Sequence, residues 1–101
     1  MEDFKELFRE NTQELLRDFK RDFALLEAKA DKSTELKNIH RYAHSMKGLS
    51  AMMELNEIYL IAEKLESMLK KIIDCALGLN KNTLLEIKAG FSKIEELVKN
   101  G

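Results

Sequence analysis

Apolar residues recur every three or four positions along most of the chain, with charged residues between them. This spacing places the apolar side chains on one side of a helix, so it predicts amphipathic helices. Interruptions divide the pattern into four stretches, and we expect helices over about residues 2–29, 34–53, 56–77 and 82–99. The predicted inward-facing residues are Phe4, Leu7, Phe8, Leu15, Phe19, Phe23 and Leu26; Leu36, Ile39, Ala43, Met46, Ser50 and Met53; Ile58, Ile61, Ala62, Leu65, Leu69, Ile72 and Ala76; and Leu84, Ile87, Phe91, Ile94 and Val98.

Polar residues and glycine mark the predicted helix ends. Ser33 and Asn56 are candidate N-caps of the second and third helices, and Asn80 or Asn82 begins the fourth. Gly78, followed by Leu79 and Asn80, predicts a C-cap for the third helix. The chain has no proline and no hairpin signal. Four amphipathic helices with short connections predict an all-α, antiparallel up-and-down four-helix bundle.

Size and charge narrow the range of functions. At 101 residues the chain forms a single domain, residues 1–101, because two cores would each be too small. Its 17 basic and 18 acidic residues are interspersed and leave a net charge of −1, without the cationic surplus that nucleic-acid binding requires. No apolar run is long enough to span a membrane or resembles a signal peptide. The one cysteine, Cys75, cannot form an internal disulfide, and we expect a cytoplasmic protein.

Candidate chemistry is concentrated in the second predicted helix. Gly48 lies in its interior, where glycine costs about 1 kcal/mol relative to alanine, so close approach of another surface is expected there. His44, Gly48 and Ala51 fall on one strip beside the apolar face, which leaves the imidazole of His44 open. A neutral imidazole is a competent nucleophile, and the Lys47 ammonium is near enough to offset the charge of a phosphoryl group.

A hairpin of the second and third helices brings further side chains to this strip. If the turn is centred on Leu55, His44 stands eleven residues before it and Glu66 eleven after it. Lys47 and Glu63 are matched in the same way at eight residues. We therefore expect Glu66 to accept a hydrogen bond from one ring nitrogen of His44, leaving the other free to attack phosphorus. Glu63 is expected to steady Lys47.

The segment LKNIHRYAHSMKGLSAMMEL, residues 36–55, resembles histidine phosphotransfer (HPt) domains, especially the N-terminal domain of chemotaxis-type histidine kinases. Those domains carry Ala-His-Ser/Thr-x-Lys-Gly-x-Ser/Ala, and the matching residues are Ala43, His44, Ser45, Lys47, Gly48 and Ser50. The LESML segment, residues 65–69, extends the resemblance. The chain departs from the family pattern at Glu54, where a second glycine is usual, at Leu55, where an aromatic residue is common, and at Glu63, where those kinases often have histidine.

The resemblance implies a phosphorelay carrier that is not itself an enzyme. His44 would be phosphorylated, Lys47 would help hold the phosphoryl group, and Glu66 would bond the histidine ring. The implied partners are the ATP-binding domain of a histidine kinase and the receiver domain of a response regulator. No cofactor is expected on this chain, because Mg²⁺ belongs to the partners, and a monomer is sufficient. The resemblance also favours an N-terminal piece of a larger kinase.

Two other interpretations are open at this stage. His40 and His44 are four residues apart and could ligate one metal ion with Glu66, although Lys47 would repel a cation. Alternatively, the chain could be an HPt-derived docking module that binds partners without phosphotransfer. Substituting His44→Gln separates these functions, since a docking module would bind equally well and a phosphocarrier would lose all signal flow.

Overall fold

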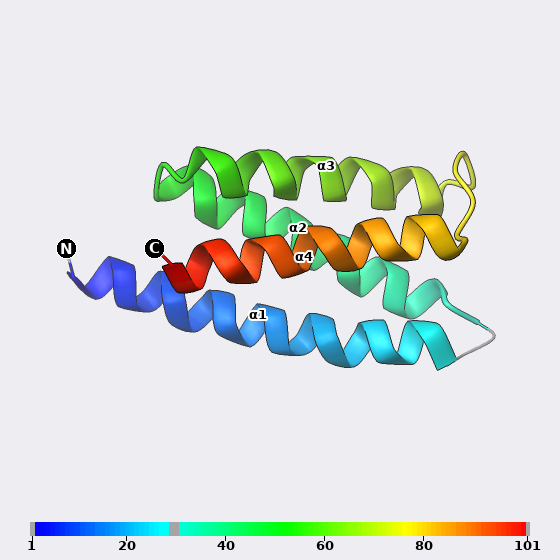
Figure 1. Ribbon diagram of the computed structural model, residues 1–101, viewed down its shortest axis with the longest axis horizontal. Helices are drawn as coiled ribbons and strands as arrows, with labels where there is room; N and C mark the ends of the chain where they lie inside the picture. The colour runs from blue at the N-terminus through cyan, green and yellow to red at the C-terminus, as the bar shows by residue number, and fades with distance from the viewer. Residues whose placement is uncertain (1, 29–30, 101) are drawn as a thin grey trace.

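The computed structural model describes residues 2–28 and 31–100, which contain four helices and no strand. The helices are α1 (Glu2–Ala28), α2 (Ser33–Met52), α3 (Asn56–Ile73) and α4 (Lys81–Asn100). They run antiparallel to their chain neighbours, and α4 returns beside α1 (Figure 1). The contacts follow the cyclic order α1–α2–α3–α4, with the most extensive between α2 and α3. The predicted up-and-down four-helix bundle is confirmed.

The core is built from the apolar stripes of all four helices. At its centre the ring of Phe19 stacks on that of Phe91, with ring centroids 3.9 Å apart, and so joins α1 to α4. The prediction of an inward stripe was wrong at the start of α1. Phe4 and Leu7 are 60% and 52% exposed. The first turn of α1, which holds Phe4, extends past the ends of the other helices (Figure 1). Leu7 precedes the buried Phe8 and lies on the solvent side of α1.

The C-terminal ends of α2 and α3 share one geometry. Glu54 has φ 56° and Cys75 has φ 63°, both in the left-handed region. After α2, the amides of Glu54 and Leu55 donate to the carbonyls of Ala51 and Ser50. After α3, the amides of Cys75 and Ala76 donate in the same way to the carbonyls of Ile72 and Lys71. Each set of bonds is a Schellman motif, which satisfies carbonyls that the end of the helix leaves unpaired.

The third helix is therefore shorter than predicted. It ends at Ile73, four residues before the expected boundary, and Ala76 is exposed. The expectation that Gly78 would form the C-cap was wrong, because Cys75 takes the left-handed conformation and no described glycine has a positive φ. The residue that takes the left-handed conformation after a helix is usually glycine. Because a cysteine takes it here, the sequence pattern does not reveal where α3 ends.

The N-terminal ends differ in how they are capped. Asn80 precedes α4 as predicted: its side-chain oxygen accepts from the amide of Thr83 (3.0 Å), and its own amide donates to the Thr83 hydroxyl (2.8 Å). Ser33 is the first residue of α2 rather than its cap, and both its amide and its hydroxyl donate to the Asp31 carboxylate. Asn56 is likewise the first residue of α3, and Leu55 before it makes no side-chain capping bond.

A buried polar contact ties α1 to α2. The Tyr42 hydroxyl donates to the Asp22 carboxylate at 2.5 Å, and both residues are buried. Burial, followed by the bond to Asp22, raises the pKa of Tyr42. This contact joins α1 to α2 in addition to the apolar packing between them. Among the helices described, none is long and apolar enough to cross a membrane.

Candidate functional site

The α2–α3 hairpin places the imidazole of His44 against the carboxylate of Glu66. His44 Nδ1 lies 2.5 Å from Glu66 Oε2, the contact that the matched positions around the turn predict. His44 comes from the middle of α2, and its side chain is 66% exposed. The Glu66 side chain, on α3, is only 16% exposed. The carboxylate is thus held between the helices, while the ring it contacts projects into solvent.

The same carboxylate also binds Lys47. Lys47 Nζ lies 2.6 Å from Glu66 Oε1, so one oxygen of Glu66 serves the histidine and the other serves the lysine. Glu63, which was expected to steady Lys47, is exposed and makes no ion pair with any described residue, so its part is limited to a minor coulombic contribution to the raised pKa of Lys47. Matching residues that are equally far from the turn did not predict this pairing. A lysine side chain is long enough to reach a carboxylate almost a turn away along the facing helix.

These contacts keep the site charged. The hydrogen bond from Lys47 lowers the pKa of Glu66, burial opposes this shift, and the contact with His44 adds to it. The same hydrogen bond raises the pKa of Lys47. At neutral pH the site therefore holds an ionised carboxylate and an ammonium next to the ring. Because a carboxylate accepts hydrogen bonds, the proton of a neutral ring lies on Nδ1, and Nε2 carries the lone pair.

Small residues follow His44 on the exposed surface of α2. A Cβ atom built on Gly48 would meet no atom within 4 Å, and Ser45, Gly48 and Ala51 are all exposed. No neighbouring part of the described chain therefore explains the glycine in the middle of α2. The open surface leaves room for another molecule to approach the histidine, as the position of Gly48 predicts.

A second helical glycine, in α4, has the opposite environment. A Cβ atom on Gly90 would lie 2.6 Å from Leu65 Cδ2, and Leu65 is buried in the core. Gly90 therefore lets α4 pack closely on α3. Sequence reasoning missed this residue, although its position in the middle of a predicted helix was a usable signal.

Metal binding at this helix face has no support in the geometry. Within residues 2–28 and 31–100, no group of three or more His, Cys, Asp and Glu side chains is arranged to hold a metal ion. Glu66 instead uses its two oxygens for His44 and for Lys47, whose ammonium would repel a cation.

Comparison with known proteins gives both sequence and structural matches. The family model described as "Hpt domain" matches residues 3–97. The fold is similar to the CheA phosphotransferase domain from Thermotoga maritima, with a TM-score of 0.90 and 21% sequence identity over 97% of this chain and 93% of that one. It is also similar to a computationally redesigned four-helix bundle, with a TM-score of 0.91 and 12% identity over 99% and 98% of the two chains. No curated protein matches the sequence.

Proposed function

The chain belongs to the Hpt domain family, and on that basis we propose that it carries a phosphoryl group on Nε2 of His44. The observation that carries this proposal is the double contact of Glu66. One carboxylate orients the exposed histidine through Nδ1 and holds Lys47 beside it. A surface histidine without a chemical role would require neither the orienting carboxylate nor the neighbouring ammonium.

Each group has a defined part in the proposed transfer. The Nε2 lone pair attacks phosphorus as the bond from phosphorus to the donor oxygen breaks, and the ring becomes positively charged. The Glu66 carboxylate stabilises that charge through the Nδ1 proton. The phosphoryl group brings roughly two negative charges, which the Lys47 ammonium offsets. In the onward transfer, a carboxylate oxygen of the acceptor attacks phosphorus, the N–P bond breaks, and the ring returns to its neutral form.

The proposed partners supply the remaining chemistry. Phosphoryl transfer depends on positioning and on neutralising charge, usually with Mg²⁺. We place that ion on the partner: the ATP-binding domain of a histidine kinase as donor, and the receiver domain of a response regulator as acceptor. The chain then acts as a carrier rather than as a catalyst. The open surface at Ser45, Gly48 and Ala51 supports approach of such a domain to His44.

Phosphorylation by a small phosphoramidate donor tests the proposal without a cognate partner. We expect ³¹P and ¹⁵N NMR to show phosphate on Nε2 of His44, and a receiver domain with Mg²⁺ to remove it. The His44→Gln variant should incorporate no phosphate, whereas the matched His40→Gln variant should behave like the unchanged protein. Phosphate on His40, or an unmodified His44, would contradict the proposal and favour the HPt-derived docking module, which needs no reactive histidine.

A further inference from the structure

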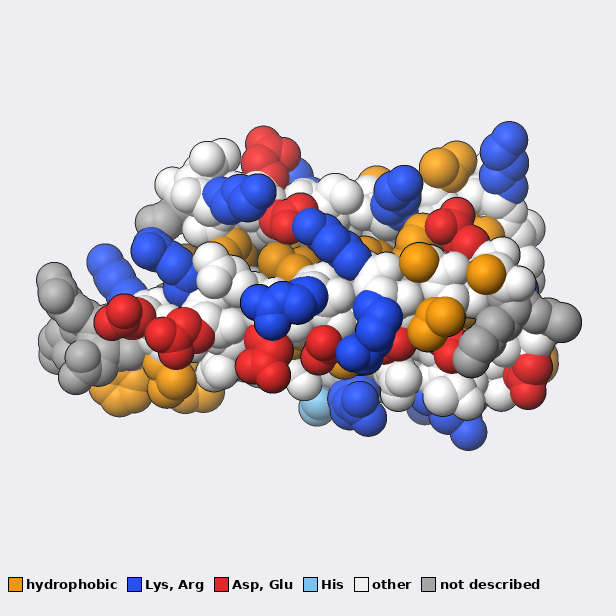
Figure 2. Space-filling view, turned by 90° about the horizontal axis from the view of Figure 1, so that it is seen from below, with side chains coloured by type: hydrophobic (Ala, Val, Ile, Leu, Met, Phe, Trp, Pro, Cys, Tyr) orange, Lys and Arg blue, Asp and Glu red, His pale blue; other side chains and the backbone are white. Residues whose placement is uncertain are grey.

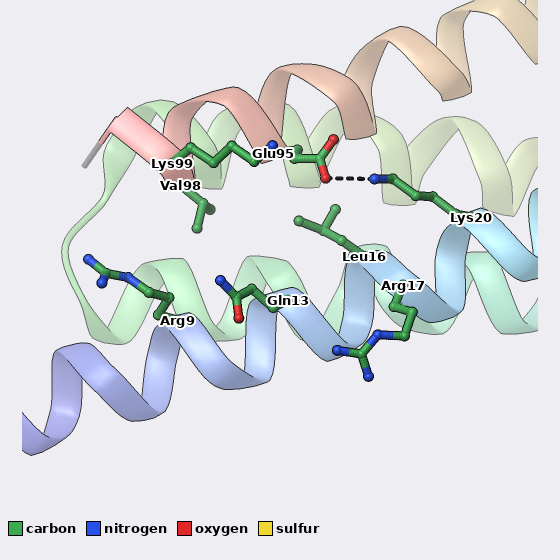
Figure 3. A pocket seen from close by; sticks show the side chains of 8 residues that line it. All are labelled: Arg9, Gln13, Leu16, Arg17, Lys20, Glu95, Val98 and Lys99. Atoms are coloured by element: carbon green, nitrogen blue, oxygen red, sulfur yellow. Dashed lines mark hydrogen bonds and ion pairs between the residues drawn. The ribbon is translucent and has the colours of Figure 1, made fainter.

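A groove runs between α1 and α4, across the bundle from the α2–α3 hairpin that carries His44. Its floor is apolar and is formed by Leu16 and Val98 (Figure 3). Lys20 reaches over from α1 to Glu95 on α4, at 2.7 Å. The other lining residues are Arg9, Gln13, Arg17 and Lys99. The cavity volume is about 540 Å³.

The groove concentrates positive charge. Arg9, Arg17, Lys20 and Lys99 line it, and Glu95 is the single carboxylate among the lining residues. Glu95 is already neutralised by Lys20, whose hydrogen bond lowers its pKa. The other three cations form no ion pair with any described residue. Since the whole chain has a net charge of −1, this excess is confined to the residues that line the groove. Figure 2 shows Lys and Arg side chains across the middle of this face, with Asp and Glu side chains interspersed among them.

An apolar cavity continues the groove towards the end of the bundle. The two share Arg9 and Val98, and the second cavity has a volume of about 230 Å³. Lys5 and Arg9 contribute the charged part of its lining. Its apolar lining residues are Phe8, Met53, Leu55, Ile58, Leu97 and Val98. The combined surface thus offers a cationic track with an apolar hollow at one end.

The length of the cationic track indicates what it binds. Arg9 and Lys20 are eleven residues apart on α1, which corresponds to about 16 Å along the helix axis. A single phosphate could contact only part of such a track, and the cations are exposed on its sides rather than buried around one point. An extended polyanion matches the spacing, and the apolar hollow adds a requirement for a hydrophobic side chain.

We propose that this groove docks an acidic segment of a partner protein, with one large apolar side chain of that segment in the hollow next to Phe8 and Leu97. Charge complementarity supplies the attraction and steers the encounter. The apolar hollow determines where along the groove the segment binds, because its buried side chain can occupy only that position. Since the groove lies across the bundle from His44, a partner docked there would leave the histidine accessible to a second domain.

The probe for this surface is a fluorescein-labelled peptide of alternating Glu and Ser with one Leu near its end. Fluorescence anisotropy measures its affinity, and ¹H–¹⁵N NMR maps its position. We expect shifts in α1 and α4 and binding that weakens as salt rises. The double variant Arg9→Gln with Lys20→Gln should lower the affinity about tenfold, because Arg9 no longer pairs with the peptide and Glu95, without Lys20, repels it. Replacing the peptide Leu by Ser should weaken binding to a similar extent.

The matched control is Lys37→Gln with Lys70→Gln, which removes the same charge from exposed positions on α2 and α3. Circular dichroism confirms that each variant is folded. Equal loss of affinity in both double variants, shifts outside α1 and α4, or no binding of the peptide would overturn the proposal. Tripolyphosphate or anionic phosphatidylglycerol vesicles that bind this groove more tightly than the peptide would also overturn it, in favour of a phosphate ligand or a membrane surface.

Discussion

At the scale of single residues, the two oxygens of the Glu66 carboxylate have different partners. Oε2 contacts the ring of His44, and Oε1 binds the ammonium of Lys47. The carboxylate thereby sets the tautomer of the ring and holds a cation where the phosphoryl charge would develop. Its partial burial strengthens both contacts, because nearby water screens them less.

The first prediction concerns that carboxylate. We expect Glu66→Ala to slow phosphorylation of His44 by about tenfold or more, since the ring loses its orienting acceptor and the charge that stabilises the imidazolium. Phosphorylation rates with a small phosphoramidate donor measure the effect. Glu63→Ala is the matched control, an exposed carboxylate of the same helix one turn earlier, and should leave the rate unchanged. Equal rates for the two variants would remove Glu66 from the mechanism.

The two helical glycines predict opposite effects on stability. Gly48→Ala should raise the free energy of unfolding by about 1 kcal/mol, because the added methyl group meets nothing and alanine favours the helix. Gly90→Ala should lower it by about 1–3 kcal/mol, because the methyl group would overlap the buried Leu65. Urea denaturation measures both values. Stabilisation by both substitutions would show that Leu65 moves aside at little cost.

Gly48→Ala also tests why glycine is present. If glycine is retained for approach of a partner, the more stable variant should transfer phosphate more slowly to a receiver domain. Its phosphorylation by a small donor should stay the same, because the methyl group does not reach the ring. An unchanged rate in both assays would leave Gly48 without a role in partner approach.

At the scale of single elements, the helix ends hold the least favourable backbone conformations. Glu54 and Cys75 are left-handed, a conformation that costs an ordinary residue roughly 1–2 kcal/mol. The Schellman hydrogen bonds and the packing of partly buried Leu55 against the core keep the first of these turns in place. The turn geometry therefore survives even though Glu54 replaces the glycine usual in HPt domains.

Glu54→Gly is accordingly expected to stabilise the protein. Glycine adopts a positive φ without strain but loses more entropy on folding, so the net gain should be about 1 kcal/mol. For a domain of this size that gain corresponds to a rise in Tm of about 4–8 °C. Differential scanning calorimetry measures it. The control is Glu57→Gly in the first turn of α3, which should lower Tm because it removes a carboxylate that favours the helix N-terminus. A lower Tm for Glu54→Gly would mean that the glutamate makes a stabilising contact in the turn.

The contact between α1 and α2 gives a prediction about how elements are joined. Tyr42→Phe removes the donor to Asp22 and leaves a buried carboxylate oxygen without it. The expected loss in the free energy of unfolding is about 2 kcal/mol. Urea denaturation again provides the measurement, and Tyr59→Phe is the control, since Tyr59 is only partly buried and makes no hydrogen bond with a described residue. A loss no larger than that of the control would mean that Asp22 is satisfied by other groups.

At the scale of the whole molecule, the cyclic packing of the helices separates two faces. The α2–α3 hairpin carries the contact between His44 and Glu66, and the α1–α4 groove carries the cationic track. The contacts are also uneven, being most extensive between α2 and α3 and least extensive between α1 and α4. The site thus belongs to the best-packed half of the bundle, which keeps the geometry of His44 and Glu66 constant.

Hydrogen exchange should reveal this unevenness. We expect the slowest amides in the facing turns of α2 and α3, and early opening of α4 and of the first turns of α1, where Phe4 and Leu7 are exposed. Packing protects amides because exchange requires local opening. Native-state exchange followed by NMR gives the order. Protection that is uniform across the four helices would show that the bundle opens only as one unit.

The sequence by itself determined the features that depend on local pattern. Periodicity predicts the number and approximate extent of the helices, and the short connection at Leu55 forces a hairpin. In a hairpin, residues equally far from the turn lie at one height, so the contact between His44 and Glu66 follows from counting. The chemistry proposed for His44 and Lys47 is likewise argued from the residue types themselves.

Only the tertiary structure decided which side chains meet when their positions depend on the rotation and offset of whole helices. The pairing of Lys47 with Glu66 instead of Glu63 depends on side-chain reach across the hairpin. The exposure of Phe4 depends on how far α1 extends beyond its neighbours, which periodicity does not record. The exposure of Leu7 depends on the rotation of α1, which buries the adjacent Phe8 instead. The cationic groove joins residues from opposite ends of the chain, Arg9 and Lys99 among them. Their proximity exists only because α4 packs back on α1, a long-range contact that no local pattern encodes.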